Sequence, residues 1–141
     1  MEKQHSGAMK TLHVMVGLPR SGKSTAAKKL GYPIVEPDAI RQVMHGTHWR
    51  AEIEPLIWGI ADLMVRSLFA AGHENVILDA VNHTDERRRK WLSPDWCVRF
   101  HVIDTPVSEC ITRAKTTKQE YLIPIIERMG AQWQMIIGDD C

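Results

Sequence analysis

Long apolar runs are missing from this sequence. No stretch of the 141 residues approaches the roughly 18 consecutive apolar residues that a membrane-spanning helix needs. The opening segment, Met1 to Lys10, is polar and lacks the apolar centre of a secretory signal. The sequence therefore predicts a protein without a membrane partner.

Cysteine is scarce, and its spacing has no recognisable pattern. Cys97, Cys110 and Cys141 are odd in number and widely spaced, and none belongs to a Cys-x-x-Cys motif. This argues against a disulfide framework and against a structural zinc site. We therefore expect a reducing, cytoplasmic location.

An excess of either charge is also absent. Eighteen basic and seventeen acidic side chains leave a formal net charge of +1. This disfavours a protein that coats nucleic acid through general basicity, although it permits a local basic groove. Hydrophobic residues make up 44% and charged residues 25%, which is typical of one soluble globular domain and not of a disordered chain.

The sequence predicts a polar tail over residues 1–8 and a single domain over residues 9–141. Apolar runs and turn residues predict strands at 12–16, 33–36, 75–79 and 98–103. Helices are expected at 23–30, from a cap at Asp38 to about 46, at 52–71, at 85–92, and from about 107 and about 124. This alternation predicts an α/β fold with a parallel sheet of four to five strands and helices on both faces. A fifth strand is doubtful because few residues follow Gly130.

One motif stands out between the first predicted strand and helix. Residues 17–24 read GLPRSGKS and fit G-x-x-x-x-G-K-[ST] at every fixed position. Glycines let the backbone wrap closely around phosphate oxygens, and the helix N-terminus adds partial positive charge. The predicted nucleotide site comprises Gly17, Leu18, Pro19, Arg20, Ser21, Gly22, Lys23, Ser24 and Thr25. Within it, Lys23 should reach the β- and γ-phosphates, and Ser24 should bind Mg²⁺. Arg20 could instead be a solvated loop residue.

The motif is a phosphate-binding P-loop, and this sequence lacks the features of several other classes of P-loop protein. The guanine-recognition motif Asn-Lys-x-Asp does not occur, and the chain is short for a helicase or a ring ATPase with a sensor domain. A small kinase needs only an acid to accept the acceptor's proton, basic residues to hold the acceptor, and a basic lid.

Candidates for the acceptor site follow the second and third predicted strands. Asp38 and Arg41 stand three residues apart on a helix start, so both should face the crevice at the carboxyl edge of the sheet. A helix cap for Asp38 and a surface ion pair for Arg41 are the structural alternatives. Asp79, with Asn82 after it, should reach the same edge, where both could contact the acceptor. Asp79 could also support Mg²⁺ through water, and a capping or turn role is its structural alternative.

Two basic stretches could contact phosphates. Residues 87–90 read RRRK, a run that more often forms a solvated helix face. Residues 110–118 carry Arg113, Lys115 and Lys118 without an acid, as a lid of about 110–123 over the transferring phosphate would. The structural alternative is a surface helix with ordinary basic decoration.

Several segments, in this order, resemble polynucleotide-kinase-like P-loop kinases, and most of all the kinase domains of the bacteriophage 5′-hydroxyl polynucleotide kinases. They are residues 17–25, 38–41, 76–88 and 102–129, and the resemblance extends from about residue 12 to about 129. The P-loop is shared by many families. The Asp-x-x-Arg element and the stretch ending in IPIIERM are more discriminating.

The resemblance implies a role for each matching residue. Asp38 would be the general base for a 5′-hydroxyl, Arg41 would bind the neighbouring phosphate, and Arg113 would be the lid arginine. The chain departs from the family at Val81, where a threonine is usual, and at Lys115 to Lys118, where a second arginine is common. A lysine cannot make a bidentate arginine contact.

The sequence therefore predicts an ATP- or GTP-dependent, Mg²⁺-requiring kinase whose favoured acceptor is the 5′ end of a polynucleotide. A small-molecule kinase, somewhat favoured by the near-neutral charge, and a non-catalytic nucleotide-binding module are the alternatives. The phosphatase signature Asp-x-Asp-Gly-Thr is missing, so no phosphatase activity is expected. The pattern leaves the oligomeric state open.

Overall fold

The computed structural model describes residues 9–46, 49–135 and 138–141. The predicted tail over residues 1–8 lies outside them. Along the chain, the elements are β1 (Thr11–Val16), α1 (Lys23–Leu30), β2 (Ile34–Val35), α2 (Pro37–His45), α3 (Glu54–Ala70), β3 (Asn75–Leu78), α4 (Asp85–Arg89), β4 (Cys97–Val102), α5 (Val107–Thr116), the 3₁₀ turn η1 (Glu120–Leu122) and α6 (Ile123–Ala131).

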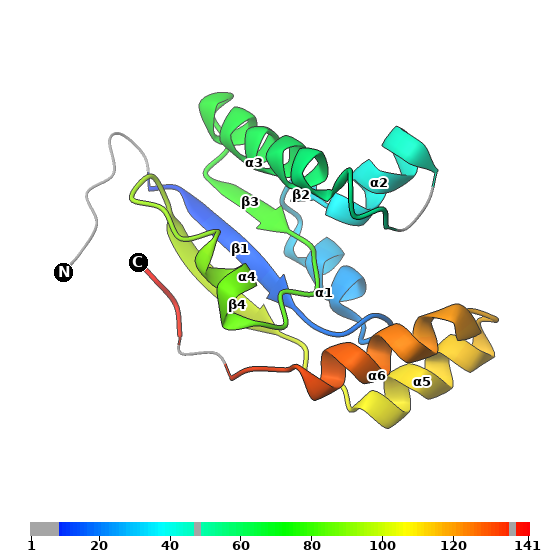
Figure 1. The fold of residues 1–141 in the computed structure, drawn as a ribbon. Helices are drawn as coiled ribbons and strands as arrows, with labels where there is room; N and C mark the ends of the chain where they lie inside the picture. Colours follow the sequence, from blue (N-terminus) through cyan, green and yellow to red (C-terminus); the bar gives the residue numbers. More distant parts are fainter. Residues whose placement is uncertain (1–8, 47–48, 136–137) are drawn as a thin grey trace.

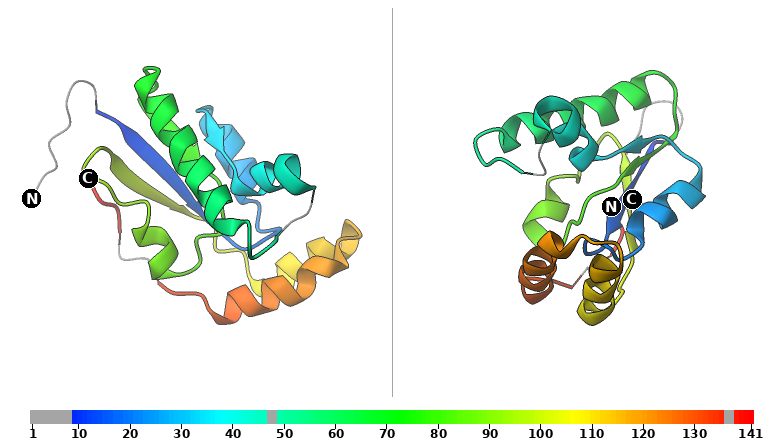
Figure 2. Two further views of the ribbon diagram at one scale, coloured as in Figure 1. Left: turned by 45° about the horizontal axis from the view of Figure 1, so that its top comes forward. Right: turned by 90° about the vertical axis from the view of Figure 1, so that its right-hand side faces the viewer.

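The strands form one parallel sheet in the order β2-β3-β1-β4. Helices lie on both of its faces, and the right-hand view of Figure 2 shows α1 and α4 on opposite sides. The predicted α/β class with a parallel sheet is confirmed. Within the part of the chain that the structure describes, the sheet has four strands, so the doubt about a fifth is supported.

The alternation of side chains along β1 explains the two layers of core. Leu12, Val14 and Val16 are fully buried in the cluster that includes α3. Met15 points to the other face and packs with Ala27 of α1. Because successive strand residues face opposite sides, one six-residue strand anchors helices on both faces of the sheet.

The predicted cap of α2 differs from the observed one. Glu36 occupies the N-cap position, Pro37 begins the helix, and Asp38 lies in its first turn. Proline favours the first helical position because its φ angle is preset and it has no N–H to satisfy. Asp38 therefore does not cap α2.

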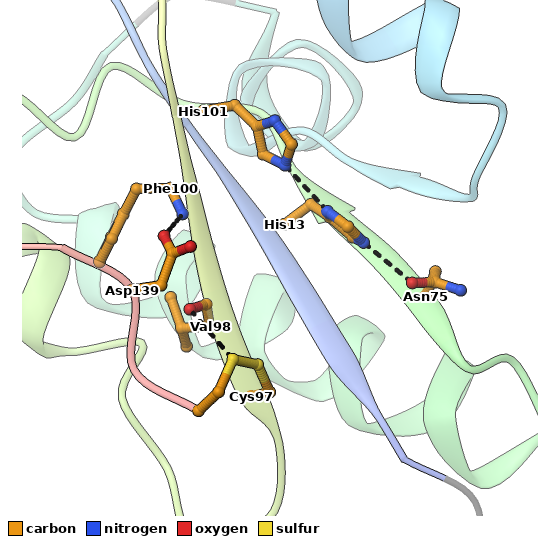
Figure 3. The surroundings of a disulfide bond; sticks show 8 residues. His13, Asn75, Cys97, Val98, Phe100, His101 and Asp139 are labelled. Atoms are coloured by element: carbon orange, nitrogen blue, oxygen red, sulfur yellow. Dashed lines mark hydrogen bonds between the residues drawn. A yellow bond between two sulfur atoms is a disulfide. The ribbon is translucent and has the colours of Figure 1, made fainter.

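The expectation that the cysteines form no disulfide is wrong for one pair. Cys97, at the start of β4, is joined to Cys141 (Figure 3). The C-terminal segment returns beside the edge strand, where Val98 and Asp140 form an antiparallel bridge. Cys110 is a free, buried thiol. The spacing of the cysteines therefore no longer supports a reducing location, and the cytoplasmic location stays a prediction.

None of the described helices is long and apolar enough to traverse a lipid bilayer.

Candidate functional site

The nucleotide loop leaves the carboxyl end of β1 and turns directly into α1. A Cβ added at Gly17 would come within 2.6 Å of the Ser21 hydroxyl oxygen, so this position requires glycine. Gly22 has a φ angle of 98°, in the left-handed region, immediately before Lys23 begins α1. No side chain among the described residues caps this helix. Its first amides are therefore available to an anion.

Hydrogen bonds from two neighbouring segments hold the loop in this shape. The Gly17 amide donates to the Val81 carbonyl at 3.1 Å, and the Thr105 hydroxyl donates to the Ser21 carbonyl at 2.7 Å. The loop is thus supported before any ligand binds, which lowers the entropic cost of binding.

Ser24 and Asp79 form a pair suited to a divalent cation. The Ser24 hydroxyl donates to Asp79 Oδ2 at 2.8 Å. Asp79 is buried, and its Oδ1 has no hydrogen-bond partner among the described residues. Mg²⁺ takes few protein ligands and completes its coordination shell with water and phosphate oxygens. The Ser24 hydroxyl and the buried, unbonded Asp79 oxygen are ligands of the kind that such a site needs.

Glu36 is a site residue that the sequence analysis missed. It follows β2, and Asp79 follows β3; the pairing of Val35 with Leu78 brings these two strand ends side by side. Burial raises the pKa of the Glu36 carboxyl, and the nearby charges of Asp79 and Asp38 raise it further. The available signal was its position as the polar last residue of a predicted strand.

Asp38 and Arg41 lie together, as the spacing predicted, but Arg41 has a second and tighter partner. Arg41 Nη1 is 3.7 Å from Asp38 Oδ1. Its Nε and Nη2 donate to the two carboxylate oxygens of Glu54 at 2.9 and 2.7 Å. The guanidinium also lies over the Trp58 ring, 5.7 Å from its centroid. Glu54 and Trp58 are on α3, so only the packing of α2 on α3 reveals these contacts.

Asn82 is buried, and its side chain forms hydrogen bonds to backbone carbonyls. Its amide nitrogen donates to the carbonyl of Met15 at 2.8 Å and to that of Ala80 at 3.3 Å. Its φ angle of 50° lies in the left-handed region, where asparagine is tolerated. The structure thus gives Asn82 a role in shaping the loop after β3, and its predicted contact with an acceptor stays a prediction.

The predicted lid, residues 110–123, covers most of α5 and the turn η1, and α5 lies beside α6 at the carboxyl edge of the sheet (Figure 1). Leu18 of the nucleotide loop packs into the small core of this pair with Cys110, Ala114 and Ile126. Arg113 Nη1 donates to the Arg20 carbonyl at 3.2 Å, and its Nη2 pairs with Glu109 at 2.7 Å. The arginine expected in the lid therefore touches the nucleotide loop. Lys115 and Lys118 are exposed.

The basic run 87–90 is not a uniform solvated face. Arg88 is only 3% exposed and donates to the carbonyls of Asn82, His83, Gln134 and Met135. It therefore links the loop after β3 to the segment after α6. The sequence pattern missed this because two of the four carbonyls, those of Gln134 and Met135, belong to a segment more than 40 residues away along the chain.

Comparison with known proteins places this geometry in a family. A family described as "AAA domain" matches residues 12–122. No curated protein sequence matches significantly. A chain in "Structure of Pnkp1/Rnl/Hen1 complex" is 27% identical, with a TM-score of 0.68, over 79% of this chain and 41% of that one.

Other solved structures share the fold. A chain in "Structure of the Pnkp1/Rnl/Hen1 RNA repair complex" is 19% identical with a TM-score of 0.72, over 99% of this chain and 50% of that one. A gluconokinase from Sinorhizobium meliloti 1021 is 17% identical with a TM-score of 0.60, over 92% of this chain and 78% of that one. This chain thus spans half or less of the matched chains in the two Pnkp1/Rnl/Hen1 structures. It belongs to the AAA-domain family, with a P-loop kinase-like fold that bears out its resemblance to polynucleotide-kinase-like P-loop kinases.

Proposed function

We propose that the protein transfers the γ-phosphate of ATP, or of GTP, to a hydroxyl group, and that its preferred acceptor is the 5′-OH end of a polynucleotide. The observation that carries this proposal is the convergence at one sheet edge of the phosphate loop, the Ser24–Asp79 pair, Asp38 with Arg41, and Arg113. Kinase chemistry requires these parts and little else.

In the reaction, the acceptor oxygen forms a bond to the γ-phosphorus, and the bond from that phosphorus to the β–γ bridging oxygen breaks. Asp38, which lies in the first turn of α2, receives the acceptor's proton. Lys23 and Arg113 stabilise charge on the transferring phosphoryl group and on the departing nucleoside diphosphate. Ser24 and Asp79 would hold Mg²⁺, which neutralises phosphate charge when bound.

The polynucleotide acceptor is favoured by Arg41 and by the 27% identical chain from the complex named Pnkp1/Rnl/Hen1. Glu54 and Trp58 fix the Arg41 guanidinium beside Asp38. A cation in that position suits the phosphate next to a 5′-hydroxyl. A small-molecule kinase is the alternative, supported by the near-neutral net charge of +1.

A panel of acceptors tests the proposal. Labelled ATP is offered with 5′-OH DNA and RNA oligonucleotides, nucleosides and sugars, and Lys23→Ala serves as the inactive control. We expect the highest kcat/KM on an oligonucleotide and a loss of about 10²–10³-fold in Lys23→Ala. A higher kcat/KM on a nucleoside or sugar would establish the small-molecule kinase. Nucleotide binding without transfer to any acceptor would establish a binding module.

Arg41→Ala separates the acceptor classes further. If Arg41 binds the phosphate beside the 5′-hydroxyl, its loss should raise KM for a 3′-phosphorylated nucleoside and for an oligonucleotide at least tenfold. A plain nucleoside has no such phosphate and should change less than twofold. Equal losses on all three acceptors would contradict the phosphate contact.

A further inference from the structure

Two hollows lie next to each other on the α3–α4 side of the protein and share two cationic side chains. The first, of about 610 Å³, is lined by Glu54, Trp58 and Trp91, together with Arg87 and Lys90. The second, of about 670 Å³, is lined by Arg87 and Lys90 again, and by residues of the segment after α6. Arg87 and Lys90 thus line both hollows and stand between them.

The first hollow begins at the proposed acceptor site. Trp58 lies beneath two guanidinium groups, that of Arg41 at 5.7 Å and that of Arg87 at 5.2 Å from the ring centroid. Glu54, which holds Arg41, also lines the first hollow. A chain whose end lies at Asp38 and Arg41 therefore meets Arg87 next.

The charges around the two hollows leave two cations available. Glu54 is paired with Arg41, and Asp62 is paired with Arg66. Arg87 and Lys90 form no ion pair with any described residue. Glu86, which also lines the second hollow, is exposed. Arg89, on the same helix, is instead paired with Asp85 at 2.5 Å. The two unpaired cations are thus the ones at the hollows.

The helix that carries them is firmly placed. Arg88, buried between Arg87 and Arg89, donates to carbonyls of the loop after β3 and of the segment after α6. The neighbouring Trp91 is buried in the main core. A rigid support lowers the entropy lost when Arg87 and Lys90 engage a ligand.

We propose that Arg87 and Lys90 bind phosphates of the acceptor strand beyond the one at Arg41. The protein would then hold several nucleotides of a single strand, and Trp58 would position the two guanidinium groups. This inference rests on the proposed function, because it extends the same acceptor site. A polyanionic strand is favoured over an uncharged metabolite because the two side chains without an ion-pair partner are both cations and stand together where the two hollows meet.

The test compares acceptor lengths in the double variant Arg87→Gln/Lys90→Gln, with Arg89→Gln as the matched control. KM is measured for a 3′-phosphorylated nucleoside, for a 5′-OH hexanucleotide and for ATP, and thermal melting confirms folding. We expect at least a tenfold rise in KM for the hexanucleotide in the double variant. KM for the nucleoside and ATP should stay within twofold, and Arg89→Gln should stay within twofold on all three.

Direct binding of a labelled hexanucleotide, followed by fluorescence anisotropy over a salt series, gives a second measurement. The slope of log K against log salt should fall by about 0.7 for each lost phosphate contact. Unchanged hexanucleotide KM and slope, or an equal KM rise for the 3′-phosphorylated nucleoside, would overturn the inference.

The two proposals can fail separately. If the hexanucleotide is phosphorylated but the double variant behaves like the parent, Arg87 and Lys90 do not bind the strand, and the proposed function stands. If no oligonucleotide is phosphorylated, the proposed function fails. In that case, weaker hexanucleotide binding by the double variant than by the parent supports the phosphate contacts of Arg87 and Lys90. Absence of hexanucleotide binding by the parent overturns them.

Discussion

Two carboxylates at the start of α2 differ in their surroundings, and the difference assigns them different roles. Glu36 lies next to Asp79 and is partly buried, and burial raises its pKa. The Asp38 side chain is 50% exposed and lies near the Arg41 guanidinium. A base must reach a substrate hydroxyl, so Asp38 is the better candidate. Glu36 is better placed to help arrange the charges around Lys23 and Asp79.

The variant Asp38→Asn tests whether Asp38 is the general base for the acceptor hydroxyl. Asparagine keeps the size of the side chain, and Asp38 does not cap α2, so folding and nucleotide affinity should survive. Loss of positioned proton transfer should lower kcat about 10²–10⁴-fold, measured with saturating acceptor and ATP. A variant with kcat within threefold of the parent would show that Asp38 is not the base.

Glu36→Gln should stabilise the protein at neutral pH. The pKa of Glu36 is raised above its usual 4.5 in the folded state, so the folded protein binds this proton more tightly than the unfolded chain. Its contribution to stability therefore falls as pH rises from below 4.5 through the folded-state pKa, and the loss is complete above it. Urea unfolding of the parent and Glu36→Gln at pH 4 and pH 7.5 measures this. We expect the variant's gain in unfolding free energy to be larger at pH 7.5. An equal difference at both pH values would contradict the raised pKa.

At the scale of elements, the lid depends on a close approach between α5, α6 and the nucleotide loop. A Cβ at Gly130 of α6 would come within 2.6 Å of Val107 Cγ2, so glycine lets the end of α6 approach the start of α5. Leu18 joins their core. The predicted lid is therefore attached to the nucleotide loop, through the packing of Leu18 and through the hydrogen bond from Arg113 to the Arg20 carbonyl.

Arg113→Ala should lower turnover more than it weakens nucleotide binding, because its charge is needed most in the transition state. An arginine at this position can contribute about 10³–10⁵-fold to the rate. Single-turnover rates and ATP affinity are measured for the parent, Arg113→Ala and Arg113→Lys. Lysine should recover only part of the rate, since it lacks the planar pair of donors. Weaker ATP affinity with normal turnover at saturation would make Arg113 a binding residue only.

Elements with strong local signals could be predicted from the sequence. The first helix has the predicted bounds, and the loop before it lies where the motif of residues 17–24 predicts it. The helix predicted from residue 85 begins there as α4, and the Thr84 side chain before it accepts a hydrogen bond from the Arg87 amide. Features that depend on distant segments could not be predicted. The hydrogen bonds between Arg41 and Glu54 require α2 to pack on α3. The burial of Arg88 requires the segment after α6 to lie beside α4.

Hydrogen bonds between side chains on different strands could not be predicted from the sequence either. The imidazoles of His13 on β1 and His101 on β4 are hydrogen-bonded at 2.9 Å, and His13 also bonds the side chain of Asn75 on β3 (Figure 3). Burial lowers the pKa of His101, and His13 lowers it further. Only the strand order β3-β1-β4 brings these three polar residues together, so no local pattern could reveal them.

At the scale of the whole molecule, the C-terminal segment fastens the edge of the sheet. The Phe100 amide donates to the Asp139 carboxylate at 2.8 Å, and Val98 and Asp140 exchange two backbone hydrogen bonds (Figure 3 shows the first contact). The disulfide from Cys97 to Cys141 closes this connection. Strand edges are prone to unwanted pairing, so the segment also protects β4.

Removal of the disulfide should lower stability without removing activity, because the bond lies at the opposite end of β4 from the nucleotide loop. It links residues 44 apart, and cross-links of that span stabilise by about 2–4 kcal/mol. Cys141→Ser should therefore melt about 6–12 °C lower than the oxidised parent. A thiol reductant should lower the melting temperature of the parent to that of the variant and leave the variant unchanged. Thiol titration in denaturant should find one free thiol in the oxidised parent, from Cys110, and three after reduction. Three free thiols before reduction would show that the Cys97–Cys141 bond does not form.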